Sequence, residues 1–131
     1  MLKIQTHLSD ELEDLIHRTI GCCIEVHRAL GPGLVERIYT RAVCLELSAK
    51  GISFETEKRC PVFYRDELIC QQRVDFVVDG QLVLEIKSVD QLASVHRGQV
   101  LSYLRLSKLP VGLLINFNVA ALPDGLKRVV L

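Results

Sequence analysis

A stripe of apolar residues with the period of an α-helix runs along the start of the chain, from Leu12 to Leu30. Ser9 stands where a helix N-cap is needed, and the acidic residues after it suit the positive end of the helix dipole. We therefore predict a helix that begins after Ser9 and ends near Ala29. A Gly-Pro-Gly break follows, and a second stripe of the same period predicts another helix up to about Lys50.

Beyond Gly51 the apolar and polar residues alternate over short stretches, as they do in half-buried strands. The loop Arg65-Asp66-Glu67 and the pair Asp79-Gly80 predict tight turns between such strands. From Leu92 to Leu106 the helical period returns, and the continuous apolar run after it is typical of a buried strand. The predicted strands are residues 54–58, 62–64, 68–72, 73–78, 81–87, 111–117 and 127–131.

This order of elements predicts an α/β sandwich in which helices flank a mixed central β-sheet. The chain has 131 residues, a length that suits one compact domain with one core, so we expect residues 1–131 to form a single domain. Apolar residues make up 49% of the chain, and no long polar tract interrupts them. This composition excludes a largely disordered protein.

Charge and cysteine content narrow the picture further. Sixteen Lys plus Arg balance sixteen Asp plus Glu, so no global field steers the chain toward nucleic acid, although a local stripe of basic residues remains open. Met1 to Asp10 lacks the pattern of a leader, and no stretch approaches the roughly 18 apolar residues of a membrane span. We expect a cytoplasmic protein without membrane contact. The five cysteines form no CxxC pair, which favours buried, reduced thiols.

The first candidate for chemistry is the triplet Glu85-Ile86-Lys87 on a predicted strand. Strand alternation places Glu85 and Lys87 on the same face, so an acid and a cation share one surface. An isolated triplet of this kind is also compatible with a solvated ion pair. Asp75, on the strand that pairs with it, makes the chemical interpretation more specific, because a second carboxylate on that face would complete a cation site.

The loop between these strands decides whether Asp75 and Glu85 share a face. A two-residue Asp79-Gly80 loop would pair Asp75 with Leu84 and send Glu85 to the opposite face. A three-residue Val78-Asp79-Gly80 loop pairs Asp75 with Val83 instead, and Asp75 then lies diagonal to Glu85. We predict the second register, because diagonal carboxylates roughly 7 Å apart can reach one cation. Mg²⁺ suits such a site, since it prefers hard oxygen ligands and needs no His or Cys.

Four segments resemble the small GxxExxY proteins of the PD-(D/E)xK nuclease-like superfamily. The naming motif is similar to Gly33-Leu34-Val35-Glu36-Arg37-Ile38-Tyr39. The superfamily's Asp strand resembles Arg73-Val74-Asp75-Phe76-Val77-Val78, and its ExK strand resembles Leu84-Glu85-Ile86-Lys87. Gln99-Val100-Leu101-Ser102-Tyr103 looks like the QxxxY helix of the RecB-like branch. The resemblance covers nearly the whole chain and implies a restriction-endonuclease-like fold.

The resemblance also implies roles for individual residues. Asp75 and Glu85 would bind Mg²⁺ or Mn²⁺, the Ile86 carbonyl would add a ligand, and Glu36 would complete the metal site from its helix. Lys87 would support the attacking water. The alternative for Glu36 is a solvated side chain next to a core tyrosine.

A second polar stripe lies on the predicted helix after the strands, where His96, Gln99 and Tyr103 recur at helical spacing. Gln99 could hold the network around Lys87, and Tyr103 could contact phosphate or substrate. A packed tyrosine with a polar rim is the alternative. His27 falls near a turn, and we do not assign it to the site.

The function that these residues favour is a metal-dependent phosphodiesterase, a nuclease that acts on DNA or on RNA by metal-activated water. The basic residues that could contact phosphate are Arg37, Arg41, Arg73 and Arg97. The alternative is a non-catalytic nucleic-acid-binding or regulatory protein that retains the nuclease fold. A homodimer or larger assembly is a further interpretation, since so small a domain offers little surface for gripping a duplex.

Overall fold

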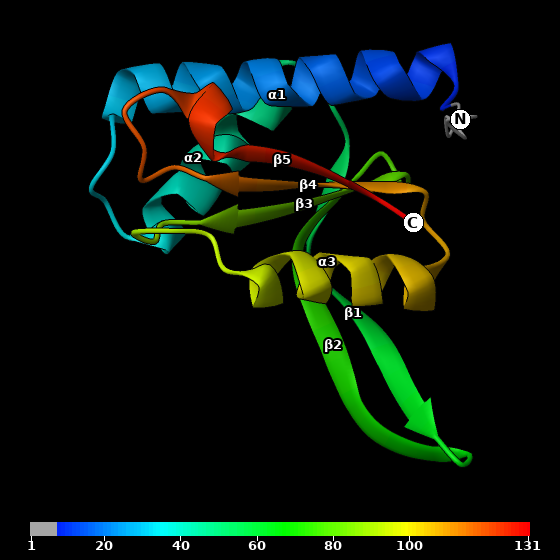
Figure 1. Cartoon of the computed structure of the whole chain (residues 1–131). Coiled ribbons are helices and arrows are strands. Elements are labelled where there is room, and N and C mark those ends of the chain that lie inside the picture. Colours follow the sequence, from blue (N-terminus) through cyan, green and yellow to red (C-terminus); the bar gives the residue numbers. More distant parts are fainter. Residues whose placement is uncertain (1–7) are drawn as a thin grey trace, which may run out of the picture.

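The computed structural model describes residues 8–131, which form a five-stranded sheet between two layers of helices (Figure 1). The strand order is β1-β2-β3-β4-β5, and every neighbouring pair is antiparallel except β3 and β4, which are parallel. The predicted α/β sandwich around a mixed sheet is confirmed. Its elements are α1 (Asp10–Leu30), α2 (Glu36–Ala49), β1 (Phe54–Tyr64), β2 (Glu67–Val78), β3 (Leu82–Lys87), α3 (Ser94–Ser107), β4 (Val111–Asn116), the 3-10 helix η1 (Leu122–Gly125) and β5 (Leu126–Val130).

The start and the end of α1 follow the local chemistry of the chain. Ser9 caps α1, and its Oγ accepts a hydrogen bond from the Leu12 N–H at 3.1 Å. Gly31 ends α1 at a φ of 68°, a conformation that side chains with a Cβ rarely adopt. The two N-terminal helices therefore lie within a residue or two of their predicted bounds.

The core has two layers, one on each face of the sheet. On one face α1 and α2 pack against β2, β3 and β4 through fully buried side chains such as Ile16, Tyr39 and Phe76. On the other face α3 covers the sheet through Val100, Tyr103 and neighbours. The central strands β3 and β4 are buried on both faces, which explains their nearly unbroken apolar sequences. The sheet is thus a rigid platform for whatever its strand ends carry.

The hairpin of β1 and β2 differs from the prediction. Four short strands were expected between residues 54 and 78, but the chain forms two long ones. Their ladder has a register shift at Val62/Phe63 and lacks a pair between Asp75 and Glu57, whose φ is 51°. The turn is Arg65-Asp66, with φ values of 51° and 65°. The length of a strand pair is set by backbone hydrogen bonds, and these continue where the alternation of apolar and polar residues is lost. The outer half of this hairpin projects away from the sandwich (Figure 1).

The predicted register between β2 and β3 is wrong by two residues. Val78 pairs with Leu82, so the loop is Asp79-Gly80-Gln81 and not Val78-Asp79-Gly80. Asp79 is anchored to Ser53, since its N–H donates to the Ser53 carbonyl at 2.9 Å and its Oδ1 accepts from the Ser53 hydroxyl at 3.0 Å. This anchor lies outside the hairpin, so the hairpin sequence alone does not reveal it. Because side chains alternate between the two faces of a strand, a register shift of two residues leaves each side chain on the same face of the sheet.

One smaller expectation also changes, namely that the cysteines are buried. All five cysteines are free, but only Cys22 and Cys23 are buried, and Cys70 is exposed on β2. None of the helices within residues 8–131 has both the length and the apolar composition of a membrane span. The expectation that residues 1–10 carry no leader falls mostly outside the described residues.

Candidate active site

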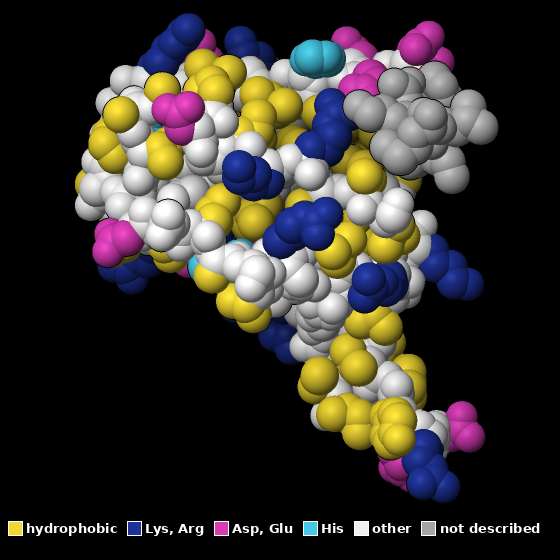
Figure 2. All heavy atoms as spheres, viewed as in Figure 1, with side chains coloured by type: hydrophobic (Ala, Val, Ile, Leu, Met, Phe, Trp, Pro, Cys, Tyr) yellow, Lys and Arg dark blue, Asp and Glu magenta, His cyan; other side chains and the backbone are white. Residues whose placement is uncertain are grey.

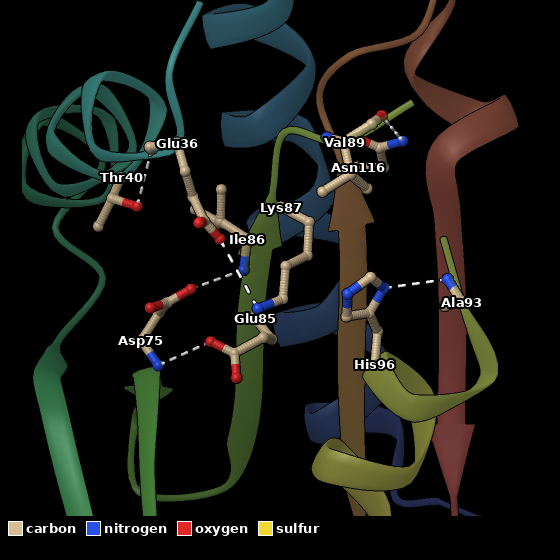
Figure 3. A network of polar contacts seen from close by, with 10 residues as sticks. All are labelled: Glu36, Thr40, Asp75, Glu85, Ile86, Lys87, Val89, Ala93, His96 and Asn116. Atoms are coloured by element: carbon tan, nitrogen blue, oxygen red, sulfur yellow. Dashed lines mark hydrogen bonds and ion pairs between the residues drawn. The ribbon is translucent and has the colours of Figure 1, made fainter. Parts of the chain in front are cut away.

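Asp75 and Glu85 meet where the ladder between β2 and β3 stops. The last backbone pair is Phe76 with Leu84, and beyond it the side chains take over the cross-strand hydrogen bonds. The Ile86 N–H donates to Asp75 Oδ2 at 2.8 Å, and the Asp75 N–H donates to Glu85 Oε1 at 3.2 Å (Figure 3). Each carboxylate is therefore fixed by the backbone of the opposite strand. The two residues face each other directly and not diagonally.

The environment of Glu85 disfavours its charge. Its side chain is 7% exposed, and burial, followed by the hydrogen bond and charge of Asp75, raises the pKa of Glu85 to about 9. Lys87 opposes this rise only in part. Two carboxylates held this close and this deep need a proton or a cation between them. The pair is thus prepared to exchange a proton for a positive ion.

Glu36 and Lys87 form the other half of the cluster. Glu36 is the first residue of α2, and its Oε1 lies 3.8 Å from Lys87 Nζ (Figure 3). Burial raises the pKa of Glu36, Lys87 lowers it and Asp75 raises it further. Lys87 is 21% exposed and Glu36 45%, so this ion pair lies at the mouth of the cluster. The acids and the single amine thereby influence one another.

Tyr39 holds the loop that presents Glu36. Its hydroxyl donates to the Gly31 carbonyl and accepts from the Leu34 N–H at 3.1 Å, while its ring stacks on Phe117 at 4.7 Å between centroids. The Ser88 hydroxyl, just past β3, donates to the Leu34 carbonyl at 2.6 Å. The loop is thereby fastened to the end of the strand that bears Lys87. The tyrosine of the Gly33–Tyr39 segment is a core residue that positions the acid three residues before it.

The four charged residues line one cavity of about 260 Å³, together with Gln72, Arg73 and Gln99. A second cavity of about 370 Å³ adjoins it, because Glu36 and Asp75 line both. The remaining walls of the second cavity are Arg37, Thr40, Arg41, Cys44, Thr56 and Glu57. Glu36 and Asp75 thus stand between two neighbouring cavities, which we together call the groove. The structure brings together Glu36, Asp75, Glu85, Lys87 and Gln99.

The family model that describes the PD-(D/E)XK nuclease superfamily matches residues 13–129. The chain belongs to this superfamily. No curated protein and no solved structure matches it. The match extends from α1 to β5 and includes the strands that carry Asp75 and the Glu85-Ile86-Lys87 triplet. Membership of the GxxExxY group and of the RecB-like branch stays a prediction.

Tyr103 lies apart from the cavity of this superfamily member. It is 1% exposed and packs between α3 and the sheet, where burial raises the pKa of its hydroxyl. Gln99, one turn earlier, does line the cavity, and its carbonyl accepts a hydrogen bond from Gln72 Nε2 at 2.9 Å. The expected contact of Tyr103 with phosphate therefore has no support in its placement, because the residue faces the core.

The two histidines near the motifs have local roles. His96 Nδ1 accepts a hydrogen bond from the Ala93 N–H at 3.0 Å and so caps the start of α3. His27 is buried, and its Nε2 donates to the Val119 carbonyl at 2.8 Å. Neither lines the cavity that holds Asp75. His27 lies near the turn after α1, as expected, but it is buried and fastens α1 to the loop after β4.

Gln72 and Asn116 are contributors that the sequence did not suggest. Gln72 lines the cavity and ties β2 to α3 through Gln99. The Asn116 side chain, at the end of β4, accepts from the Val89 N–H at 3.1 Å and donates to the Val89 carbonyl at 2.9 Å. It fixes the segment that follows Lys87. The roles of both residues depend on contacts between distant segments, so no local sequence pattern predicts these roles.

The donors present suit a hard divalent cation, although not the full set that was expected. Within residues 8–131, no group of three or more His, Cys, Asp or Glu side chains is close enough to hold a metal. Asp75 and Glu85 supply two carboxylates, and Mg²⁺ is commonly bound by one or two carboxylates plus water. The Ile86 N–H points to Asp75, and in a strand the carbonyl of the same residue faces the same edge. Glu36 is instead held by Lys87.

Proposed function

We propose that this chain is a metal-dependent phosphodiesterase that cleaves nucleic acid at the groove beside Asp75, Glu85 and Lys87. The observation that carries the proposal is that the buried Glu85 faces the half-buried Asp75, together with Lys87 two residues after Glu85 on the same strand. A structural role alone would not require two acids to share so small a volume against their mutual repulsion. Membership of the nuclease superfamily agrees with this interpretation.

Asp75, Glu85 and the Ile86 carbonyl would hold Mg²⁺ or Mn²⁺. The ion supplies Lewis acidity, which activates water at neutral pH and stabilises charge on the leaving oxygen. The chain supplies the rest. Backbone N–H groups fix one oxygen of each carboxylate, so the other oxygens, Asp75 Oδ1 and Glu85 Oε2, remain for the cation. This rigidity reduces the reorganisation that binding requires.

Lys87 acts on the substrate and on water. Its ammonium lies at the mouth of the cluster, where it can donate hydrogen bonds to a phosphate oxygen and offset the charge that develops there. Glu36 contacts this ammonium and keeps it extended over the cavity. Because the contact is 3.8 Å long and partly exposed, it leaves Lys87 free to turn toward phosphate.

The substrate strand follows the groove. Arg73 lines the first cavity, Arg37 and Arg41 line the second, and Arg97 lines neither of them. Arg37 and Arg41 lie one turn apart on α2, so both guanidinium groups can meet successive phosphates. Such contacts give affinity without sequence readout. DNA is the first substrate class to test and RNA the second.

A non-catalytic nucleic-acid-binding protein is the second candidate. One observation favours it, namely that among residues 8–131 no three His, Cys, Asp or Glu side chains are close enough to hold a metal together. The two candidates differ in their response to metal and substrate. In either case we propose that residues 1–131 act as one domain.

The deciding experiment combines a cleavage assay with metal binding. Purified chain is incubated with Mg²⁺ or Mn²⁺ and with single-stranded, duplex, branched and RNA substrates, in parallel with Asp75→Asn. Calorimetry measures metal binding by both proteins. Cleavage that requires metal and is lost in Asp75→Asn supports the nuclease. Metal-independent binding of nucleic acid without cleavage supports the alternative.

A further inference from the structure

Glu57, in the middle of β1, has a backbone conformation that is costly for a residue with a side chain. Its φ is 51°, which lies in the left-handed region, and it forms no ladder pair with Asp75, the residue opposite it on β2. For a residue with a Cβ this conformation lowers the folding equilibrium constant by roughly tenfold. The strained residue thus lies directly across from a candidate metal ligand, and strained backbone is concentrated at functional sites.

The distortion turns the Glu57 side chain into the groove. Thr56 and Glu57 both line the second cavity, which shares Glu36 and Asp75 with the first. Neighbouring residues of a regular strand point to opposite faces, so the left-handed residue accounts for their shared cavity. A carboxylate therefore stands among the arginines that we propose as phosphate contacts.

The path of the chain requires a distortion here, but it does not require an acid. Val74 packs on the face of the sheet that α3 covers, whereas Phe76, two residues later, packs on the face of α1 and α2. The strands therefore turn over at this point. Gly or Asn would adopt the left-handed conformation at lower cost than Glu. The carboxylate at position 57 thus has a role that is separate from the backbone.

Glu57 holds one of the basic residues of the groove. Its Oε1 accepts a hydrogen bond from Arg73 Nη1 at 3.4 Å. Arg73 lines the first cavity and Glu57 the second, so the ion pair joins the walls of the two cavities. The side chains of Glu57 and Arg73 are 71% and 57% exposed, and such a pair changes an equilibrium constant by at most about fivefold. The ion pair is therefore easily replaced by a contact with another anion.

We propose that Glu57 is a specificity-determining residue, which occupies Arg73 until a phosphate group of the substrate takes its place. This inference rests on the proposed nuclease function, since the phosphate must enter the cavity that holds Asp75 and Glu85. A guanidinium group binds phosphate and carboxylate with the same bidentate geometry, so the two anions compete for Arg73. A strand that does not reach the first cavity leaves the ion pair intact. Glu57 thereby disfavours nucleic acid that binds away from the metal site.

Binding of DNA without metal tests this exchange. Fluorescence anisotropy measures the affinity of the full chain for short single-stranded and duplex DNA in EDTA. Glu57→Gln keeps the size of the side chain and should tighten binding about two- to fivefold, because Arg73 is then free. Glu55→Gln is the matched control and should leave the affinity unchanged. Glu55 is also an exposed acid of β1 in an ion pair, with Lys58 at 2.8 Å, but it lines neither cavity.

A double-mutant cycle determines whether Glu57 acts through Arg73. Arg73→Gln should weaken binding, and adding Glu57→Gln to it should give no gain, because no guanidinium group remains to be released. A gain of the same size in both backgrounds would assign the effect to general charge repulsion and overturn the proposal. An unchanged or weaker affinity of Glu57→Gln in the wild-type background would also overturn it.

Two glycine variants separate the charge from the backbone strain. Glu57→Gly and Asp66→Gly each remove a carboxylate from a left-handed residue, with φ values of 51° and 65°. Both should raise the melting temperature by roughly 2 to 5 °C, but only Glu57→Gly should tighten DNA binding. The turn that carries Asp66 lies at the far end of the projecting hairpin, away from the body of the molecule (Figure 2). An equal gain in affinity in Asp66→Gly would contradict a role specific to position 57.

The nuclease proposal and this inference can fail separately. Tighter DNA binding by Glu57→Gln, without cleavage of any substrate in Mg²⁺, would support the exchange at Arg73 and count against the nuclease. Metal-dependent cleavage by wild type, with a DNA affinity that Glu57→Gln leaves unchanged, would do the reverse. If neither wild type nor Glu57→Gln binds DNA, the exchange is wrong whatever the cleavage assay shows.

Discussion

Replacing Glu85 with Gln should stabilise the metal-free protein at alkaline pH. The buried Glu85 carboxyl, next to Asp75, has a pKa raised to about 9. An acid whose pKa is higher in the folded than in the unfolded state makes the folded protein bind the extra proton. Stability therefore falls as pH rises from the unfolded pKa of about 4.5 toward 9. Gln carries no charge, and its amide can donate to Asp75 in place of the lost proton.

The expected magnitude follows from one proton. A full proton difference changes the free energy of unfolding by about 1.4 kcal/mol per pH unit, which is an upper limit here because Lys87 and water relieve part of the repulsion. We expect wild type in chelator to lose about 1 to 2.5 kcal/mol between pH 6 and pH 8 relative to Glu85→Gln. For a domain of this size the loss corresponds to a melting temperature lower by roughly 3 to 10 °C.

Thermal unfolding in EDTA at several pH values measures this difference. Glu11→Gln is the control, because Glu11 is an exposed acid on α1. The reasoning is refuted if wild type and Glu85→Gln lose stability in parallel with pH, or if the variant is the less stable of the two at pH 8. A second readout is the gain in stability on adding Mg²⁺, which should grow with pH in wild type because the cation competes with the shared proton.

Further outcomes concern the remaining groups of the site. Lys87→Ala should lower cleavage by about 10²-fold or more while metal binding by calorimetry stays, and equal cleavage by both proteins would remove Lys87 from the mechanism. Asp75→Asn should reduce the rise in melting temperature with Mg²⁺, and an undiminished rise would place the ion elsewhere. The double variant Arg37→Ala with Arg41→Ala should raise KM more than it lowers kcat. It should also reduce the slope of log affinity against log salt concentration by about one for each lost phosphate contact. Arg105→Ala, at an exposed position on α3, is the control and should change neither quantity. Tyr39→Phe should cost about 1 to 3 kcal/mol of stability, measured by urea unfolding, since the Leu34 N–H then loses its acceptor.

Sequence periodicity predicted the layers of this fold, because the spacing of apolar residues in each helix and strand indicates which face is buried. Periodicity left open whether Asp75 and Glu85 share a side, and we chose the register in which both reach one cation. The observed register differs from that choice by two residues, which leaves both side chains on one side. The register itself depended on Ser53, more than twenty residues away, which anchors Asp79. The turn at Arg65 and the strands beside it were predicted, but the unbroken length of β1 and β2 was not, because their backbone ladder runs on where the apolar alternation stops.

Sequence reasoning misplaced one residue, Tyr103, and missed two, Gln72 and Asn116. The positions of all three are set by contacts between elements and not by the spacing within one element. Tyr103 shares a helix face with Gln99, but α3 packs closely on the sheet there, so one turn separates a cavity wall from the core. Gln72 and Asn116 act through backbone groups of distant segments. A motif fixes residue types along one element, whereas these contacts arise between elements.

The charges of the cluster bear on how a chain with no net charge would bind the polyanionic substrate that we propose. Glu36, Asp75 and Glu85 carry three potential negative charges against the one positive charge of Lys87, so the fully ionised cluster would repel phosphate. One proton on Glu85 relieves part of this excess in the metal-free protein, and one divalent cation would cancel it. The arginines of the groove then meet the phosphates without an opposing field. Binding of substrate should therefore strengthen when the metal is present. Titrations of a nucleic acid against Lys87→Ala, with and without Ca²⁺, measure that coupling. Ca²⁺ binds carboxylates but commonly fails to support such cleavage. Equal affinity in both conditions would show that the acids do not limit substrate binding.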